Sequence, residues 1–246
     1  MSISLRIALV KHAPTSCARG LEDRKEIYGH PRPSAYQADH ASDRPPAESE
    51  GRFASFTESA FVQVAALCPA TRSITSQPET LQLPGRTYTP DYRVETVDGR
   101  TSLWEVKLEA KVPKHRALFN LAAGHLAERG EHFFVISEKT LRRRRQHEDV
   151  RLVLRYAKGH FEPNEVARVT QHLLAHPSGA SIQKLATELL VPRELLFHLI
   201  ATRVITFAGA ISTAPNSRLI HTDYLENNDA LFLARWLGVS PWRTNV

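Results

Sequence analysis

Cysteine is scarce in this 246-residue chain, which contains only Cys17 and Cys68. Two cysteines cannot build a disulfide framework or a cysteine-rich zinc site, and such scarcity is typical of a reducing compartment. Long apolar runs are also missing, because no stretch approaches the roughly 18 to 20 apolar residues of a membrane-spanning helix. The short apolar run at the N-terminus is interrupted by Arg6 and does not resemble a signal peptide. We therefore expect a cytoplasmic protein without a membrane partner.

Several catalytic signatures are lacking as well. The chain has neither a P-loop nor a glycine-rich dinucleotide motif, so we do not expect it to use ATP itself. No local signature supports Ser-His-Asp or Cys-His catalysis. His172 and His176 have metal-ligand spacing, but without a third ligand in reach they are interpreted as helix-surface histidines.

The composition that is present fits a globular protein, with 42% hydrophobic and 24% charged residues. The formal net charge of +6 at pH 7 is a moderate excess. It favours a polyanionic partner such as nucleic acid without requiring one.

The first 50 residues differ in character from the rest of the chain. Prolines are interspersed there with charged and small residues, so residues 1–50 are expected to form an irregular arm that docks on a partner or stays mobile. From about Arg52, apolar residues recur at helical spacing until Pro69, which predicts a helix. Residues 72–83 then indicate a strand broken at Gln77-Pro78, because proline cannot donate to a strand ladder.

A hairpin is predicted next, from the turn signal Asp98-Gly99 between two strand-like segments, residues 86–96 and 101–110. A helix over residues 114–130 follows. Residues 132–137 are almost wholly apolar, which is typical of a strand buried on both faces. This order of helix, strands, helix and strand predicts an α/β fold with a mixed sheet flanked by helices.

We expect this α/β domain to span residues 51–158. Residues 159–222 contain three predicted helices followed by two short strands, which is the pattern of a winged-helix-like domain. Residues 223–246 are expected to form a C-terminal tail with one short amphipathic helix that docks on the rest of the chain.

Charged residues occupy one side of the predicted hairpin. Strand side chains alternate between faces, so Glu105 and Lys107 project together, and Asp91 on the first strand is expected to lie beside them. The same alternation predicts that Tyr88 and Tyr92 share the opposite face. Two carboxylates and an ammonium group in a buried hairpin are costly without a function or a counter-ion. The structural alternative is an exposed hairpin face with a cross-strand salt bridge.

The functional interpretation of these charges is a metal site. Mg²⁺ takes carboxylate oxygens from one or two side chains, together with phosphates and water. A neighbouring lysine can orient the attacking water and offset the charge that develops on phosphorus. A third acid is expected from the first helix, where Glu58 stands among apolar residues of one face.

A wider pattern accompanies these residues. Pro90-Asp91 and the later Glu105-Val106-Lys107 match the PD-(D/E)xK nuclease signature. The helix with Glu58, the following Gln77-Pro78 and the "YTPD" motif together resemble the N-terminal domain of the TnsA family of transposon-encoded endonucleases. The likeness extends over roughly residues 50–220, although the segment "LCPATRS" after the helix lacks the acidic run expected there.

The resemblance implies a restriction-endonuclease-like fold and Mg²⁺-dependent hydrolysis of one DNA strand at each transposon end, with Mn²⁺ able to substitute. It implies that Asp91 and Glu105 hold the metal, that Glu58 is a further ligand directly or through water, and that Lys107 orients the water. Gln77 is a candidate site-lining residue. The implied partners are double-stranded DNA, a TnsB-like transposase and a TnsC-like ATPase, and the implied location is the bacterial cytoplasm, at the nucleoid when active.

Basic residues follow the predicted nuclease core. We interpret them as contacts to DNA phosphates, although a solvated basic helix is the alternative; the candidates are Arg142, Arg143, Arg144, Arg145, Arg151 and Arg155. The expected recognition helix, residues 192–203, offers only three cations, Arg193, His198 and Arg203. The sequence therefore leaves open whether this helix binds DNA, binds a protein or is scaffolding.

Two other functions compete with the transposition nuclease. One is a stand-alone restriction or repair nuclease of the same fold, and the other is a catalytically silent adaptor that binds DNA or protein. The four charged residues, Glu58, Asp91, Glu105 and Lys107, argue against silence, because an abandoned site has no reason to keep them.

Overall fold

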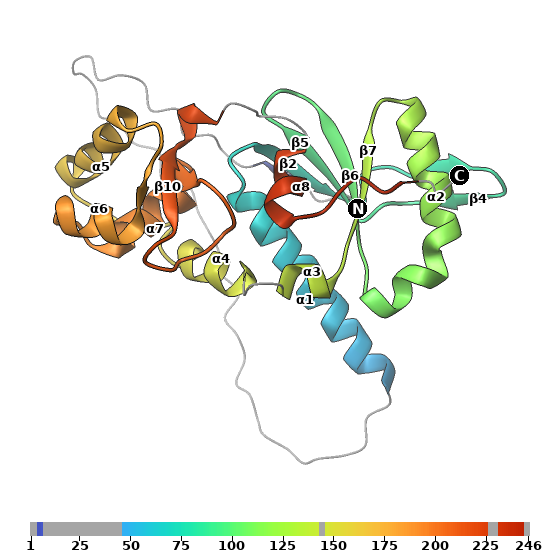
Figure 1. The fold of residues 1–246 in the computed structure, drawn as a ribbon. Helices are drawn as coiled ribbons and strands as arrows, with labels where there is room; N and C mark the ends of the chain where they lie inside the picture. The colour runs from blue at the N-terminus through green and yellow to red at the C-terminus, as the bar shows by residue number, and fades with distance from the viewer. Residues whose placement is uncertain (1–3, 7–45, 143–145, 226–230, 244–246) are drawn as a thin grey trace, which may run out of the picture.

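A five-stranded mixed sheet, in the order β1-β2-β5-β6-β7, organises the first half of the chain (Figure 1). The computed structural model describes residues 4–6, 46–142, 146–225 and 231–243. The strands of this sheet are β1 (Ser4–Arg6), β2 (Thr71–Ser76), β5 (Tyr92–Thr96), β6 (Thr101–Val106) and β7 (His132–Ile136). All neighbouring strands are antiparallel except β6 and β7, which are parallel and joined by a crossover helix. The predicted α/β architecture with a mixed sheet is confirmed.

One helix covers each face of the sheet. Helix α1 (Pro46–Leu67) packs through Phe61 on Trp104 of β6, with ring centroids 5.1 Å apart. Helix α2 (Val112–Glu128) lies on the other face with Leu103 and Phe133, together with a separate two-stranded sheet. That small sheet consists of β3 (Leu81–Leu83) and β4 (Arg86–Tyr88).

The hairpin forms at its predicted turn, but its first strand is shorter than expected. Strands β5 and β6 pair with Tyr92 opposite Trp104, whereas β4 leaves the sheet and pairs with β3. The chain changes direction at Thr89 and Pro90, where proline provides no backbone N–H for a ladder. The prediction that Tyr88 and Tyr92 share a face is therefore wrong, since the two tyrosines belong to different sheets.

The N-terminal prediction also needs correction. Strand β1 pairs antiparallel with β2, with Leu5 opposite Ile74, so part of the expected irregular arm belongs to the sheet. Helix α1 begins at Pro46 rather than near Arg52, and proline is well suited to the first turn of a helix. Residues 7–45, the main part of the expected arm, lie outside the described residues.

Helices dominate the second half of the chain. They are α3 (Glu138–Arg142), α4 (Gln146–Leu154), α5 (Pro163–Ala175), α6 (Ile182–Glu188), α7 (Arg193–Ala201) and α8 (Phe232–Leu237). A three-stranded antiparallel sheet, ordered β8-β10-β9, accompanies them; its strands are β8 (Ala180–Ser181), β9 (Ile205–Phe207) and β10 (Arg218–His221). The three predicted helices after residue 159 and the two strands that follow them are present.

One continuous hydrophobic core joins the two halves. It includes Phe61 and Trp104 beneath the mixed sheet and also Leu195, Phe207 and Trp236 of the C-terminal half. Helix α4 lies between α1 and α7, and α8 inserts Trp236 and Leu237 into the same core. The short C-terminal helix therefore docks as predicted, and the position of the α1 helix depends on packing from both halves.

Candidate active site

The end of strand β6 brings three of the predicted site residues together. The Asp91 carboxylate lies beside β6 because its Oδ2 accepts a hydrogen bond from the Val106 backbone N–H at 2.8 Å. The Lys107 Nζ lies 2.7 Å from Glu105 Oε1. Glu105 and Lys107 are two residues apart on an extended chain and thus project to the same side. The exposed hairpin face that was the structural alternative is not observed, because Glu105 is only 3% exposed.

Helix α1 adds Glu58 to this charge cluster. The side chain is half-buried, and no direct contact with the other acids is observed for it among the described residues. Burial raises the pKa of the Glu58 carboxyl, while the Lys107 ammonium lowers it and the Glu105 carboxylate raises it. The charge of Glu58 therefore interacts with those of Lys107 and Glu105, although Glu58 makes no observed direct contact with the other acids in the described chain.

The charge of Glu105 disfavours the charged form of Asp91, which lies beside β6. Burial raises the pKa of Asp91 well above its usual range, and the nearby negative charge of Glu105 raises it further. The hydrogen bond from Val106 and the Lys107 ammonium oppose this shift. The pKa of Lys107 is raised despite its burial, because Glu105 accepts its hydrogen bond and all three acids favour the cation. One ammonium shared by three acids leaves negative charge that a further cation would neutralise.

The donor set suits a hard divalent cation, but as a pair of acids rather than a triad. Within the described part of the chain, no three His, Cys, Asp or Glu side chains are grouped so as to hold one metal ion. Two carboxylates are sufficient for Mg²⁺ where water and phosphate oxygens complete the octahedron. The prediction that Asp91 and Glu105 hold the metal, with Glu58 as a further ligand directly or through water, stays a prediction.

One tyrosine of the site, Tyr88, escaped the sequence reasoning, and a second, Tyr92, lies beside the site. The Tyr88 hydroxyl donates a 2.6 Å hydrogen bond to Glu105 Oε2, and burial together with the Glu105 charge raises the pKa of this phenol. Tyr92 packs on Phe61, and burial, Glu58 and Asp91 raise the pKa of Tyr92 to about 12. Strand alternation failed to predict the contact of Tyr88 with Glu105, because that rule assumes a continuous strand through Pro90. Its place three residues before Asp91 was the available signal.

Gln77 approaches the site through its backbone. Its N–H donates to the Asp91 carbonyl oxygen at 2.8 Å, and its φ of 45° shows a left-handed turn there. The Gln77 side chain is exposed. The predicted site-lining residue thus anchors the turn that carries Asp91.

The candidate DNA-binding arginines are only partly described. Arg142 ends α3 and lines a hollow of about 630 Å³ with Glu109, Glu138 and Lys139, just beyond the end of β6. Arg151 and Arg155 are exposed and one helical turn apart. Arg143, Arg144 and Arg145 lie outside the described residues.

The presumed recognition helix α7 is largely buried. Five of its residues belong to the core, namely Leu195, Leu196, Phe197, Leu199 and Ile200. Its three cations bind within the chain: Arg193 donates to the Thr213 carbonyl, the His198 ring contacts the Tyr156 carbonyl, and Arg203 donates to the carbonyls of Ala66 and Thr71. Of the interpretations left open by the sequence, scaffolding is the one that these contacts favour.

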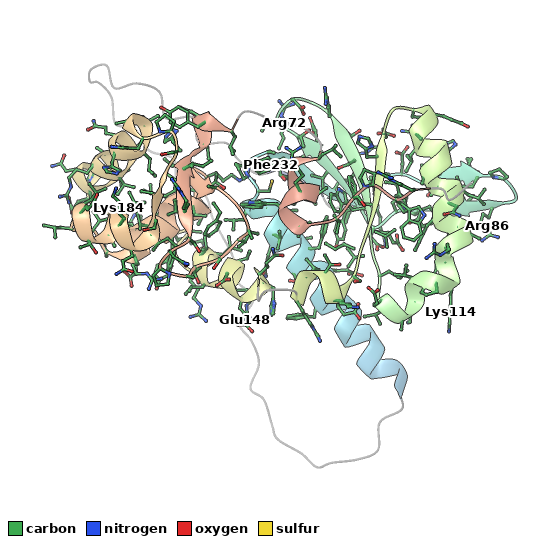
Figure 2. All side chains as sticks on the ribbon, viewed as in Figure 1. Arg72, Arg86, Lys114, Glu148, Lys184 and Phe232 are labelled. Atoms are coloured by element: carbon green, nitrogen blue, oxygen red, sulfur yellow. The ribbon has the colours of Figure 1, made fainter. Side chains whose placement is uncertain are left out.

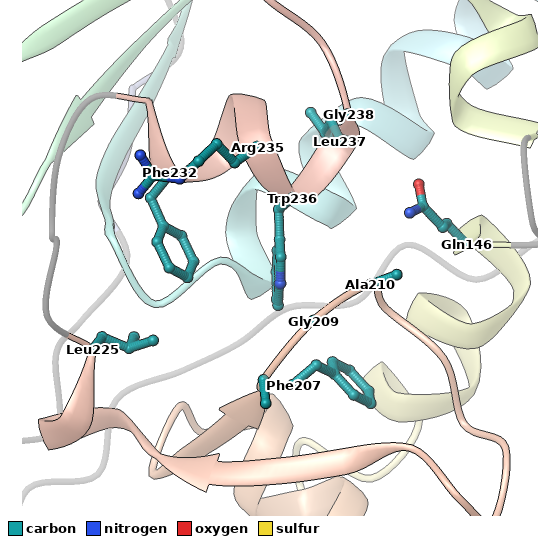
Figure 3. Close-up of a pocket in the computed structure, with 11 residues that line it drawn as sticks. Gln146, Phe207, Gly209, Ala210, Leu225, Phe232, Arg235, Trp236, Leu237 and Gly238 are labelled. Carbon is teal, nitrogen blue, oxygen red and sulfur yellow. The ribbon is translucent and has the colours of Figure 1, made fainter. Parts of the chain in front are cut away.

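A separate cavity lies at the C-terminal helix. It measures about 420 Å³ and is bordered by Phe207, Phe232 and Trp236 between α8 and β9 (Figure 3). None of its lining residues is acidic, so it is distinct from the carboxylate cluster. His172 and His176 stack at 4.3 Å on α5, and no metal-binding group of three is found around them in the described chain.

Two comparisons with known proteins found no match. No protein-family model matches the chain, and no curated protein matches it. Among the described helices, none has both the length and the apolarity needed to cross a membrane.

Proposed function

We propose that this chain is a Mg²⁺-dependent DNA endonuclease of the PD-(D/E)xK class, built on a restriction-endonuclease-like fold. The observation that carries this proposal is the half-buried Asp91 and the buried Glu105 beside Lys107 at the end of a mixed sheet. Two like charges held together away from solvent lower stability, and a cation-dependent reaction is a reason to retain them.

Each residue has a distinct part in the proposed hydrolysis. Asp91 and Glu105 would hold the cation, which would supply charge neutralisation on the phosphate and a more acidic bound water. The Lys107 ammonium donates a hydrogen bond to the attacking water and lies where negative charge develops. As the water oxygen bonds to phosphorus and passes one proton to bulk water, the bond from phosphorus to the leaving sugar oxygen breaks, and that oxygen takes up a proton from bulk water. Glu58 accepts a hydrogen bond from water on the α1 side.

The resemblance to TnsA-like endonucleases directs the proposal to DNA transposition. On that basis the chain cuts one strand at each transposon end, together with a TnsB-like transposase and a TnsC-like ATPase. The C-terminal half is proposed to be a winged-helix-like domain that supports the nuclease. DNA contact is assigned to α4, through Arg151 and Arg155, rather than to the buried α7.

A nicking assay on supercoiled DNA carrying a transposon end tests this function. Wild type is expected to nick with Mg²⁺ or Mn²⁺ after addition of the partner proteins and to show little activity without them, and Asp91→Asn is expected to be inactive in both cases. Asp98→Asn is the matched control, because it removes the same charge at the exposed turn of the same hairpin.

The outcomes separate the alternatives. Cutting that needs no partner indicates a stand-alone restriction or repair nuclease of the same fold. Partner binding with no nicking under any condition indicates an adaptor and contradicts the proposal.

A further inference from the structure

The carboxylate of Glu105 is held at both oxygens. Oε1 lies 2.7 Å from the Lys107 Nζ, and Oε2 accepts a hydrogen bond of 2.6 Å from the Tyr88 hydroxyl. Because the side chain is almost fully buried, water cannot replace either partner. These two contacts together determine the orientation of the Glu105 carboxylate and the direction of its remaining lone pairs.

Tyr88 is itself firmly seated. It lies opposite Leu81 in the small β3–β4 sheet, and its ring meets the ring of Phe133 edge-on, with centroids 6.2 Å apart. This sheet packs against α2 in a core cluster that also contains Phe119. The small sheet thus delivers one buried phenol to the face of β6 that carries Glu105.

The same short turn also carries Asp91. Tyr88 and Asp91 are separated only by Thr89 and Pro90, and proline restricts the backbone between them. The turn is pinned at Asp91 by the backbone N–H groups of Gln77 and Val106, both at 2.8 Å. One ligand of the proposed cation and the residue that orients the other ligand are therefore parts of one rigid unit.

We propose that Tyr88 is a positioning residue that orients Glu105 to bind the divalent cation. This inference rests on the proposed function and adds to it a residue that touches neither substrate nor cation. Without the hydroxyl, Oε2 is left buried and unpaired, and the carboxylate turns toward Lys107. This rotation withdraws a carboxylate oxygen from the cation, and loss of such outer contacts typically weakens metal binding roughly 10- to 100-fold.

The test is Mn²⁺ binding to the full chain at pH 8, measured by calorimetry for wild type, Tyr88→Phe and Asp91→Asn. Tyr92→Phe is the matched control, since its hydroxyl lies near Glu58 and Asp91 but makes no observed hydrogen bond to an acid in the described chain. We expect binding by wild type and Tyr92→Phe, binding roughly 10-fold or more weaker by Tyr88→Phe, and none by Asp91→Asn. The double variant Glu105→Gln with Tyr88→Phe separates a positioning role from a structural one. If Tyr88 acts through the Glu105 carboxylate, Tyr88→Phe should weaken Mn²⁺ binding no further in a protein that already carries Glu105→Gln.

Failure of the inference differs from failure of the function. Wild type that binds no Mn²⁺ contradicts the nuclease and this inference together. If wild type and Tyr88→Phe bind Mn²⁺ equally and Asp91→Asn does not bind it, only the role of Tyr88 is overturned. A Tyr92→Phe loss as large as that of Tyr88→Phe overturns it as well. If Tyr88→Phe fails to fold and Glu105→Gln restores folding, the hydroxyl serves stability and the proposal is wrong.

Discussion

Asp91 is the residue at which function and stability conflict most directly. In Asp91→Asn the amide oxygen still accepts the Val106 N–H, while the charge that repels Glu105 is removed. We therefore predict complete loss of DNA nicking with the free energy of unfolding unchanged or increased by about 1 kcal/mol. Thermal melting and the nicking assay, run on the same preparation, check both halves of this prediction. Loss of folding would identify Asp91 as structural, and full activity would remove it from the mechanism.

Substitution of Lys107 is expected to change the free energy of unfolding in the opposite direction to Asp91→Asn. Lys107→Met leaves Glu105 and Asp91 without their shared counter-charge. Nicking should be lost here too, but the free energy of unfolding should fall by about 1 kcal/mol, because the ammonium is partly exposed and its contribution is screened. Urea unfolding of both variants compares the signs directly. A stability gain in Lys107→Met would contradict this charge balance.

Cys68 provides a pH-dependent prediction away from the site. Burial raises the pKa of its thiol to about 11 from the ordinary value of 9. Between these values the unfolded thiol loses its proton and the folded thiol keeps it, so the stabilising contribution present below pH 9 is lost as pH rises toward 11. Cys68→Ala should flatten this decline, which is at most about 1.4 kcal/mol per pH unit. Urea unfolding at pH 8, 9 and 10 measures it, and parallel curves for both proteins would refute it.

At the scale of elements, Arg203 fastens the C-terminal half to the end of α1. It follows α7 with a φ of 63°, in a helix-ending turn where the Val204 N–H donates to the Leu199 carbonyl. Its guanidinium donates to the Ala66 carbonyl at 2.6 and 3.0 Å and to the Thr71 carbonyl at 2.6 Å. The Ala66 carbonyl lies at the C-terminal end of α1, the helix that carries Glu58, where a cation is favoured, and Thr71 is the first residue of β2.

We predict that Arg203→Ala lowers the free energy of unfolding by about 3 kcal/mol, from the loss of several charge-assisted hydrogen bonds. Arg203→Gly should be less destabilising than the alanine variant by about 1 kcal/mol, because glycine accepts positive φ without strain. Arg193→Ala, which removes one exposed hydrogen bond and a cation–π contact with Phe197, is the control and should cost below about 1 kcal/mol. Denaturant titration checks the ranking, and equal losses for Arg203→Ala and Arg193→Ala would contradict it.

Local sequence signals predicted most of the elements of this fold. The turn at Asp98-Gly99, the helix stop at Pro69 and the strand break at Gln77-Pro78 all depend on neighbouring residues, and each is observed. Strand alternation likewise placed Glu105 and Lys107 together. These features are determined by backbone chemistry and side-chain period within a few residues.

Contacts distant in sequence were not predictable in this way. The pairing of β1 with β2 and the departure of β4 into its own sheet depend on which backbone groups remain unpaired elsewhere. Helix α4 packs against α7 and contributes to its burial. The sequence of α7 alone did not predict this burial, because the helix also carries polar residues. The Tyr88 contact followed from both effects, since only the folded β3–β4 sheet brings that phenol to Glu105.

At the scale of the whole molecule, exposed cations on α4 are expected to carry DNA affinity. Arg151 and Arg155 are exposed and one helical turn apart. Lys184 on α6 lies at one end of the molecule, and Lys114 on α2 lies toward the other (Figure 2). The paired substitution of both arginines by Gln should reduce the magnitude of the log affinity against log salt slope by about 1 to 2. Fluorescence anisotropy with a DNA duplex at several salt concentrations measures this slope.

The control for this measurement is a second double variant, Arg168→Gln with Lys184→Gln. These cations are equally exposed, and each lies within an ion pair of its own helix. The same charge change should leave the slope as in wild type. Identical slopes for both double variants would mean that α4 does not contact phosphate and that only net charge matters.

The central claim is that Asp91 and Glu105 form a cation-binding hydrolytic centre. Its most direct test is anomalous scattering from crystals of the full chain soaked in Mn²⁺. The account predicts one dominant peak about 2.0 to 2.5 Å from a carboxylate oxygen of each residue, and no such peak in Asp91→Asn crystals. A peak elsewhere in the molecule, or none at millimolar Mn²⁺, would contradict the claim.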